Sequence, residues 1–163
     1  MNDQELLQSY AEALRYMCNA ESTLQKAGKE NNRYDDAKYV STACGTAYKG
    51  VLIAFDAWLA RKGAPMPTKR DKTKRHRSID MYKKEVGKFD RKMLGDLNSA
   101  YNVLHLDGYY DGIADARIIR AGFAVAYEII EKIKPAIADT EIQQYIDSYR
   151  KPSFLRKLYM LLI

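Results

Sequence analysis

Apolar residues recur every three or four positions along most of the chain, which is the spacing of one buried face of an α-helix. No segment shows the strict apolar–polar alternation that is typical of a β-strand. The pattern predicts long helices over residues 3–27, 35–61, 78–104 and 113–133, and a shorter helix over residues 139–149. Because the long helices have similar lengths and mostly short connections, we expect an all-α fold: an antiparallel up-down-up-down four-helix bundle with a short C-terminal helical extension over residues 139–163.

Residues at the ends of these segments support the predicted boundaries. Gly28 ends the first helix, and the polar segment 29–33 is expected to be a loop. Pro65 and Pro67 stop the second helix because proline has no backbone N–H to donate. With 163 residues the chain can bury one core, so residues 1–163 are expected to form a single domain. Side chains that commonly cap helix N termini precede three of the helices, namely Asn2 or Asp3, Asp35 or Asp36, and Ser78.

The inward-facing positions predict one hydrophobic core. Cys18 and Cys44 fall in the same apolar pattern, which indicates two buried thiols in a reducing cytosol rather than a disulfide. The N-terminal residues lack the pattern of a signal peptide, and no apolar run is long enough to span a membrane, so a cytoplasmic protein without membrane association is expected. The predicted core includes Leu14, Val51, Phe89, Met93, Leu97, Phe123, Tyr127 and Ile130.

The most concentrated set of polar and aromatic groups surrounds the connection between the third and fourth helices. Tyr101, His105 and Tyr109 are four residues apart, so they share one face if the helix continues that far. A histidine held by a carboxylate can act as a general base, with an arginine balancing the developing charge. The candidate catalytic residues are therefore His105, Tyr109, Asp111 and Arg117, with Arg120 as an alternative to Arg117.

A structural interpretation of the same residues competes with the catalytic one. Gly108 is then a helix stop, and Asp111 is the N-cap of the next helix. Tyr109 and Tyr110 would cover the end of the bundle, and His105 would form a hydrogen bond within the turn. We favour this interpretation because it gives each residue a sufficient architectural role.

A basic linker, expected over residues 68–77, joins the second and third helices. Residues 69–92 contain eleven Lys and Arg against four Asp and Glu, whereas the whole chain has a net charge of +6, so the basicity is local. Such a patch can bind phosphates, or it can be a solvated linker. No aromatic residue interrupts the basic run, so binding there would involve the nucleic-acid backbone. The candidate contacts are Lys69, Arg70, Lys72, Lys74, Arg75 and Arg77.

The long paired helices, together with Ala100-Tyr101, Leu104-His105, the segment 108–112 (GYYDG) and residues 122–130, resemble the HEPN superfamily. In particular, they look like a small HEPN-like family of bacterial helical proteins. The resemblance implies an antiparallel four-helix bundle that is often dimeric. It also implies links to RNA cleavage, to toxin modules paired with a nucleotidyltransferase, and to nucleic-acid defence.

Active HEPN proteins carry the motif Arg-x(4–6)-His on a bundle helix, and this chain departs from that pattern. No arginine precedes His105 at the required distance, because those positions hold residues 98–101. The formal match is Arg70 with His76, which lies in the basic linker. No His, Cys or carboxylate cluster has metal-ligand spacing, and no glycine-rich phosphate loop follows a strand, so no metal and no cofactor are expected.

The last residues of the chain are strongly apolar (154–163, FLRKLYMLLI). Chain ends are usually polar, so this segment is expected to pack on its own bundle or on a second copy, and we predict a homodimer. The principal functional hypothesis is a non-catalytic, HEPN-like interaction protein associated with RNA, with a nucleic-acid-processing or nucleotidyltransferase-type partner, or with a toxin–antitoxin system. The alternatives are a metal-independent HEPN ribonuclease and a structural dimeric adaptor without a nucleic-acid ligand.

Overall fold

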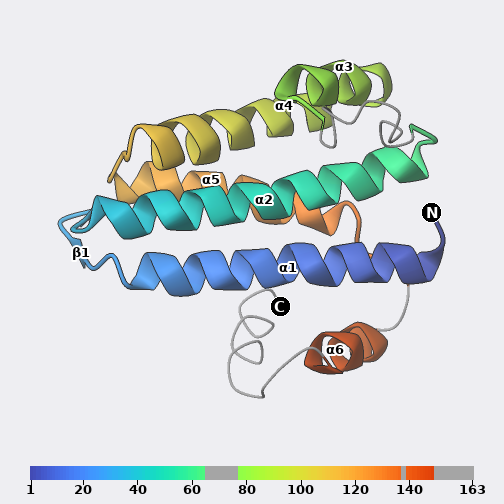
Figure 1. The fold of residues 1–163 in the computed structure, drawn as a ribbon, viewed down its shortest axis with the longest axis horizontal. Coiled ribbons are helices and arrows are strands. Elements are labelled where there is room, and N and C mark those ends of the chain that lie inside the picture. The colour runs from blue at the N-terminus through green and yellow to red at the C-terminus, as the bar shows by residue number, and fades with distance from the viewer. Residues whose placement is uncertain (65–76, 137–138, 149–163) are drawn as a thin grey trace, which may run out of the picture.

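The computed structural model describes residues 1–64, 77–136 and 139–148, and this part of the chain is almost entirely helical (Figure 1). The prediction of an all-α protein is therefore confirmed. The basic residues 69–76 and the apolar tail lie outside the described residues. The helices are α1 (Asp3–Gln25), α2 (Ala37–Arg61), α3 (Ile79–Phe89), α4 (Arg91–Ala100), the π-helix η1 (Tyr101–Tyr110), α5 (Ala116–Glu131) and α6 (Asp139–Ser148), with two short strands, β1 (Lys29–Glu30) and β2 (Arg33–Tyr34).

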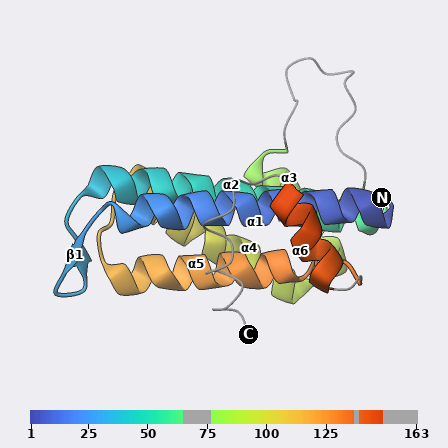
Figure 2. The ribbon, with the colours of Figure 1, turned by 90° about the horizontal axis from the view of Figure 1, so that it is seen from below.

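The long helices pack in two layers. Helices α1 and α2 lie side by side in one layer, and α4, η1 and α5 form the other (Figures 1 and 2). The first pair approaches closely at Gly50 of α2, where an added Cβ would stand 3.1 Å from the carbonyl oxygen of Ala13. Helix α6 packs against α1 (Figure 2). No helix in the described ranges combines the length and apolar character needed to cross a bilayer.

The predicted N-terminal caps are present. Asn2 and Glu5 form a capping box at α1, in which each side chain accepts from the other's backbone N–H at 2.8 Å. The carboxylate of Asp36 accepts from the N–H of Lys38, and the hydroxyl of Ser78 accepts from the N–H of Met81. Local sequence therefore determines where α1, α2 and α3 begin.

The predicted third helix is wrong as a single element, because it breaks at Asp90. This residue is extended, and its carboxylate accepts hydrogen bonds from the N–H groups of Lys92 and Met93, so it caps α4. The break also changes the direction of Phe89, which was predicted to be buried. Its side chain is 45% exposed and contacts the edge of Trp58 with ring centroids 6.0 Å apart.

The predicted loop over residues 29–33 contains a small β-hairpin. Asn31 and Asn32 both have positive φ, at 46° and 64°, as a tight type I′ turn requires. Two backbone hydrogen bonds then tie the hairpin to the start of α5: Tyr34 donates to Ala114, and Ala116 donates to Asn32, both at 2.8 Å. The connection before α2 and the connection before α5 are therefore held together.

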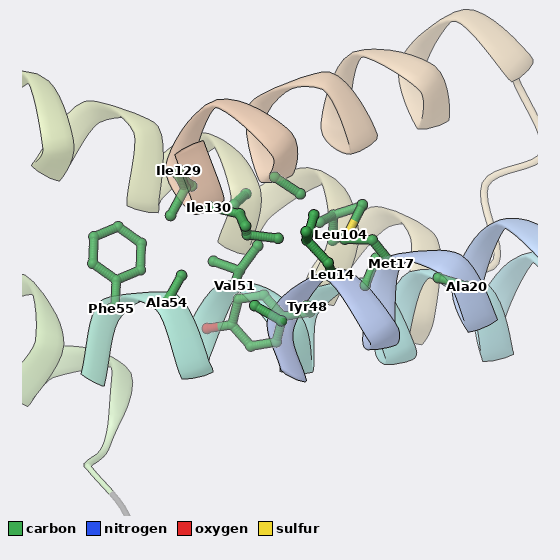
Figure 3. Packing of buried hydrophobic residues seen from close by; sticks show 14 of the residues in the cluster. Leu14, Met17, Ala20, Tyr48, Val51, Ala54, Phe55, Leu104, Ile129 and Ile130 are labelled. Carbon is green, nitrogen blue, oxygen red and sulfur yellow. The ribbon is translucent and has the colours of Figure 1, made fainter. Parts of the chain in front are cut away.

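One hydrophobic core joins both layers (Figure 3). Of the predicted core residues, Leu14, Val51, Met93, Leu97, Phe123 and Ile130 are buried, whereas Phe89 is exposed and Tyr127 is only half-buried. The hydroxyl of Tyr127 donates to Glu21 at 2.8 Å, and the hydroxyl of Tyr10 donates to Glu131 at 2.7 Å. These hydrogen bonds at the core edge connect α1 to α5. Cys18 and Cys44 are buried, as predicted.

Candidate functional site

The segment that was expected to end at Gly108 continues as a π-helix to Tyr110. The prediction of a helix stop at Gly108 is wrong, and the N–H of Asp111 still donates five residues back to Leu106, at 2.9 Å. Asp111 does not cap the next helix either; Asp115 does, and it accepts from the N–H groups of Arg117 and Ile118. Extended π-helices are rare, and π-helical turns are frequent at functional sites.

Close contacts between η1 and α2 depend on glycine. A Cβ added at Gly108 would stand 2.4 Å from the sulfur of Cys44, and a Cβ added at Gly45 would stand 2.9 Å from the ring of Tyr109. Each helix therefore presents a glycine where the other presents a side chain. Because the backbone of η1 lies so close to α2, His105 and Tyr109 reach the outer surface of α2 beside Tyr48.

His105 lies among four tyrosine rings. Its imidazole is nearly parallel to Tyr48, with centroids 4.8 Å apart and planes at 27°, and nearly parallel to Tyr109, at 5.9 Å and 12°. Tyr101 lies 5.2 Å away and Tyr110 meets the imidazole edge-on at 5.1 Å. The prediction that Tyr101, His105 and Tyr109 share one face is confirmed, because the helix does continue through all three.

An open pocket of about 550 Å³ lies in front of these rings. Lys49 is exposed at this pocket, and in the part of the chain that the structure describes, no residue that lines the pocket carries a carboxylate. The walls come from α1, α2 and η1. They consist of Tyr16, Thr42, Gly45, Thr46, Tyr48, Lys49, Leu52, His105 and Tyr109.

The surroundings of His105 do not favour proton transfer. Burial lowers the pKa of His105, so the imidazole is neutral at neutral pH. Within the described ranges, no carboxylate accepts a hydrogen bond from its ring. Nearby, burial raises the pKa of Tyr48 and raises the pKa of Cys44 to about 12, so both remain protonated. This arrangement favours ring stacking over acid–base or nucleophilic chemistry.

The structure unites only two of the four principal catalytic candidates, His105 and Tyr109. Asp111 is exposed and is not part of the pocket wall. Arg117 is also exposed, and its guanidinium pairs with Asp115 at 2.9 Å. The side-chain hydrogen bond from Arg117 is the main reason that the pKa of Asp115 lies far below its usual range. Arg120 donates to the carbonyl of its own helix at Ala116.

Of the basic-linker candidates, Arg77 is described, and it lies inside the fold. Arg77 is only 6% exposed. Its guanidinium pairs with the carboxylate of Asp56 and donates a hydrogen bond to the carbonyl of Ala64 at 3.0 Å. Tyr82 also donates to Asp56, at 2.8 Å. Arg77 therefore fastens α3 to α2. Lys69, Arg70, Lys72, Lys74 and Arg75, together with His76, lie outside the described residues.

Sequence reasoning missed the α2 side of the pocket. A signal was present, because Thr42, Gly45, Thr46, Lys49 and Leu52 recur every three or four residues and so form one face of a helix. That face is mostly polar or small, which made it look like an ordinary solvated surface. In the part of the chain that the structure describes, no group of three His, Cys, Asp or Glu side chains could hold a metal ion.

Fold and site together define the class: an all-α protein with an open, aromatic-lined pocket where a π-helix packs against α2. The chain belongs to the family DUF5618, a domain of unknown function, whose model matches residues 8–135. A solved structure described as a protein of unknown function from Dyadobacter fermentans is similar to this chain. It is 36% identical, with a TM-score of 0.65, covering 82% of this chain and 96% of that chain. A search of curated proteins finds no match. The family match includes every residue of the pocket wall.

Proposed function

We propose that this protein is a non-catalytic, HEPN-like helical binding protein that associates with RNA. The observation that carries the proposal is the environment of His105, which contacts four tyrosine rings. A histidine that serves as a general base needs a partner that orients it and a nearby charge that stabilises the transition state. Stacked rings supply neither, but they provide flat apolar surface of the kind that holds nucleobases.

The HEPN-like part of the proposal concerns architecture. In the proposed antiparallel up-down-up-down bundle, the four long elements would be α1, α2, the combined segment α4–η1, and α5. The pairing of α1 with α2 and the contacts that α5 makes with α2 and α4 are consistent with this arrangement. The buried cysteines are consistent with a reducing, cytoplasmic location.

The RNA association is tested by binding of labelled single-stranded RNA, measured by fluorescence anisotropy over a range of salt concentrations. Because Arg77 lies inside the fold, about four or five phosphate contacts from the basic linker predict a log–log slope of roughly −3 to −4. Neutralising Arg70, Lys74 and Arg75 together should flatten the slope by about two or more. A variant that neutralises Lys26, Lys29 and Arg33 at the hairpin has the same net charge and serves as the control. If the protein bound neither RNA nor DNA at low salt, the proposed RNA association would be overturned, and the structural dimeric adaptor would be the remaining hypothesis.

A ribonuclease is the second candidate, and one sequence observation favours it: Arg70 and His76 have the spacing of the HEPN motif. Incubation with single-stranded RNA in the presence of a chelator tests this activity. We expect no cleavage above background. Cleavage that disappears in His76→Ala would establish the ribonuclease, and cleavage that disappears in His105→Ala would make His105 the catalytic residue.

We further propose that the protein is a homodimer and that its protein partners are nucleotidyltransferase-type or other RNA-processing proteins. The apolar sequence of residues 154–163 supports self-association, because a run of apolar side chains needs a surface to cover it. Deleting Lys157–Ile163 should lower the mass measured by light scattering if the tail forms the contact. An intact protein that remains monomeric at high micromolar concentration would contradict the dimer.

A further inference from the structure

We propose that the pocket between α2 and η1 binds one nucleobase of single-stranded RNA, with Lys49 contacting the attached phosphate. This inference rests on the proposed function, because it assigns the base-binding position of the same RNA-associated protein. In this proposal the pocket binds a base, whereas the proposed contacts of the basic linker are to the phosphates of the RNA backbone.

Three rings at the pocket stack on one another, and Tyr109 is the most exposed of the three. His105 is nearly parallel to both Tyr48 and Tyr109, at interplanar angles of 27° and 12°. The Tyr109 side chain remains 46% exposed, although its ring lies against Gly45. Because every base has a flat π face, rings placed in this way can bind a base without requiring one particular sequence.

Charge at the pocket selects an anionic ligand over a cationic one. Aromatic rings can also bind ammonium groups, but such sites are favoured when a carboxylate is present and disfavoured beside another cation. Among the described residues, the pocket wall contains Lys49 and no carboxylate. A nucleotide joins a flat, neutral base to an anionic phosphate, so the base can stack on the rings while the phosphate contacts the lysine.

Two threonines add hydrogen-bond acceptors. The hydroxyl of Thr42 donates to the carbonyl of Lys38 at 2.9 Å, and the hydroxyl of Thr46 donates to the carbonyl of Thr42 at 2.7 Å. Since each hydroxyl proton is already used, each oxygen can only accept. Amino groups on a base are the matching donors, so adenine, cytosine and guanine, which each carry one, fit the pocket better than uracil, which does not.

The test compares two labelled probes of about 15 nucleotides, an oligoadenylate and an abasic strand with the same phosphates. The intact protein should bind the oligoadenylate more tightly than the abasic strand. Tyr109→Leu should weaken oligoadenylate binding roughly fivefold to a hundredfold and leave abasic binding unchanged. Tyr109→Phe keeps the ring and should bind like the unmodified protein. Phe89→Leu is the matched control, because Phe89 is 45% exposed and lies outside the pocket.

A second measurement uses the unmodified protein and so does not depend on whether a variant folds. The chain has two histidines, which makes the His105 ring signals easy to assign by NMR. Adenosine 5′-monophosphate should shift the His105 signals and leave the His76 signals in place. Ribose 5-phosphate, which has no base, should shift neither.

The outcomes distinguish the two proposals. If neither probe binds, the proposed RNA association fails and the base-binding pocket fails with it. Three results together would overturn the base-binding pocket: equal binding of both probes, no effect of Tyr109→Leu, and no shift of the His105 signals by the nucleotide. RNA association through phosphates would still stand in that case. Selective loss of oligoadenylate binding in Tyr109→Leu, with the His105 shift, supports both.

Discussion

Gly108 of η1 lies against Cys44 of α2 so closely that a Cβ at position 108 would stand 2.4 Å from the cysteine sulfur and 2.8 Å from its Cβ. This contact positions the π-helix, because a larger residue would push η1 away from α2. His105 and Tyr109 lie on either side of Gly108 in the sequence. The geometry of the pocket therefore depends on a residue that does not line it.

Gly108→Ala should destabilise the protein by about 1–3 kcal/mol, since a methyl group has no room in this contact. Urea unfolding followed by circular dichroism measures the effect. Gly95→Ala is the control, because a Cβ at Gly95 would meet nothing within 4 Å, and alanine should be neutral or stabilising there by up to about 1 kcal/mol. The double variant Gly108→Ala with Cys44→Gly should recover part of the loss. Equal stabilities for the two single variants would contradict the close contact.

Phe123→Ala should cost about 3–5 kcal/mol, because the ring is only 6% exposed and its removal leaves a cavity in the core. Phe89→Ala, at a position with similar apolar patterning, should cost about 1 kcal/mol or less, since it removes mainly the edge contact with Trp58. Thermal and urea unfolding of the two variants give the comparison. A larger loss for Phe89→Ala would show that α3 buries this side chain in solution.

Asp56→Ala should destabilise the protein by about 2–4 kcal/mol, because it removes the carboxylate that pairs with the buried guanidinium of Arg77 and accepts from Tyr82. The matched control is Glu85→Ala, whose side chain is as exposed as that of Asp56 but pairs with the exposed Lys88 instead of a buried guanidinium, so the urea midpoint should be nearly unchanged. Amide hydrogen exchange should locate the Asp56→Ala effect in α3 and the end of α2. A uniform loss of protection would contradict a local fastening role.

His105 should make the free energy of unfolding depend on pH. Burial holds its pKa in the folded protein below the ordinary value of 6.5, so on acidification the unfolded chain takes up this proton more readily than the folded chain. The stability that neutral His105 contributes is therefore present at pH values above its ordinary pKa of 6.5 and is lost as the pH falls below that pKa. His105→Phe keeps a ring in the stack and should show a smaller loss across that window.

Burial also raises the pKa of Glu21. Because Glu21 is present in both the unmodified protein and His105→Phe, its contribution to the pH dependence cancels when the two are compared. Urea midpoints measured about one pH unit above and one below 6.5 provide the test. Identical pH dependence in the two proteins would show that His105 is as freely protonated in the fold as in the unfolded chain.

Local sequence alone determined the all-α class and most helix starts. Apolar spacing is a property of each segment, and Asn2, Asp36 and Ser78 cap helices through backbone groups only two or three residues away. These interactions need no distant partner, so sequence predicts them well. The shared face of Tyr101, His105 and Tyr109 was predictable for the same reason once the helix continued.

Tertiary packing decided what local signals could not. Gly108 looks like a helix stop, but its missing side chain instead lets η1 approach Cys44, a residue 64 positions earlier in the chain. The break at Asp90, by contrast, follows from a local signal that the apolar pattern concealed, because its carboxylate caps N–H groups only two and three residues away. The pocket brings Tyr16, Lys49 and His105 together from three separate helices. Such a site depends on contacts between distant residues, and the spacing within any one segment carries no information about them.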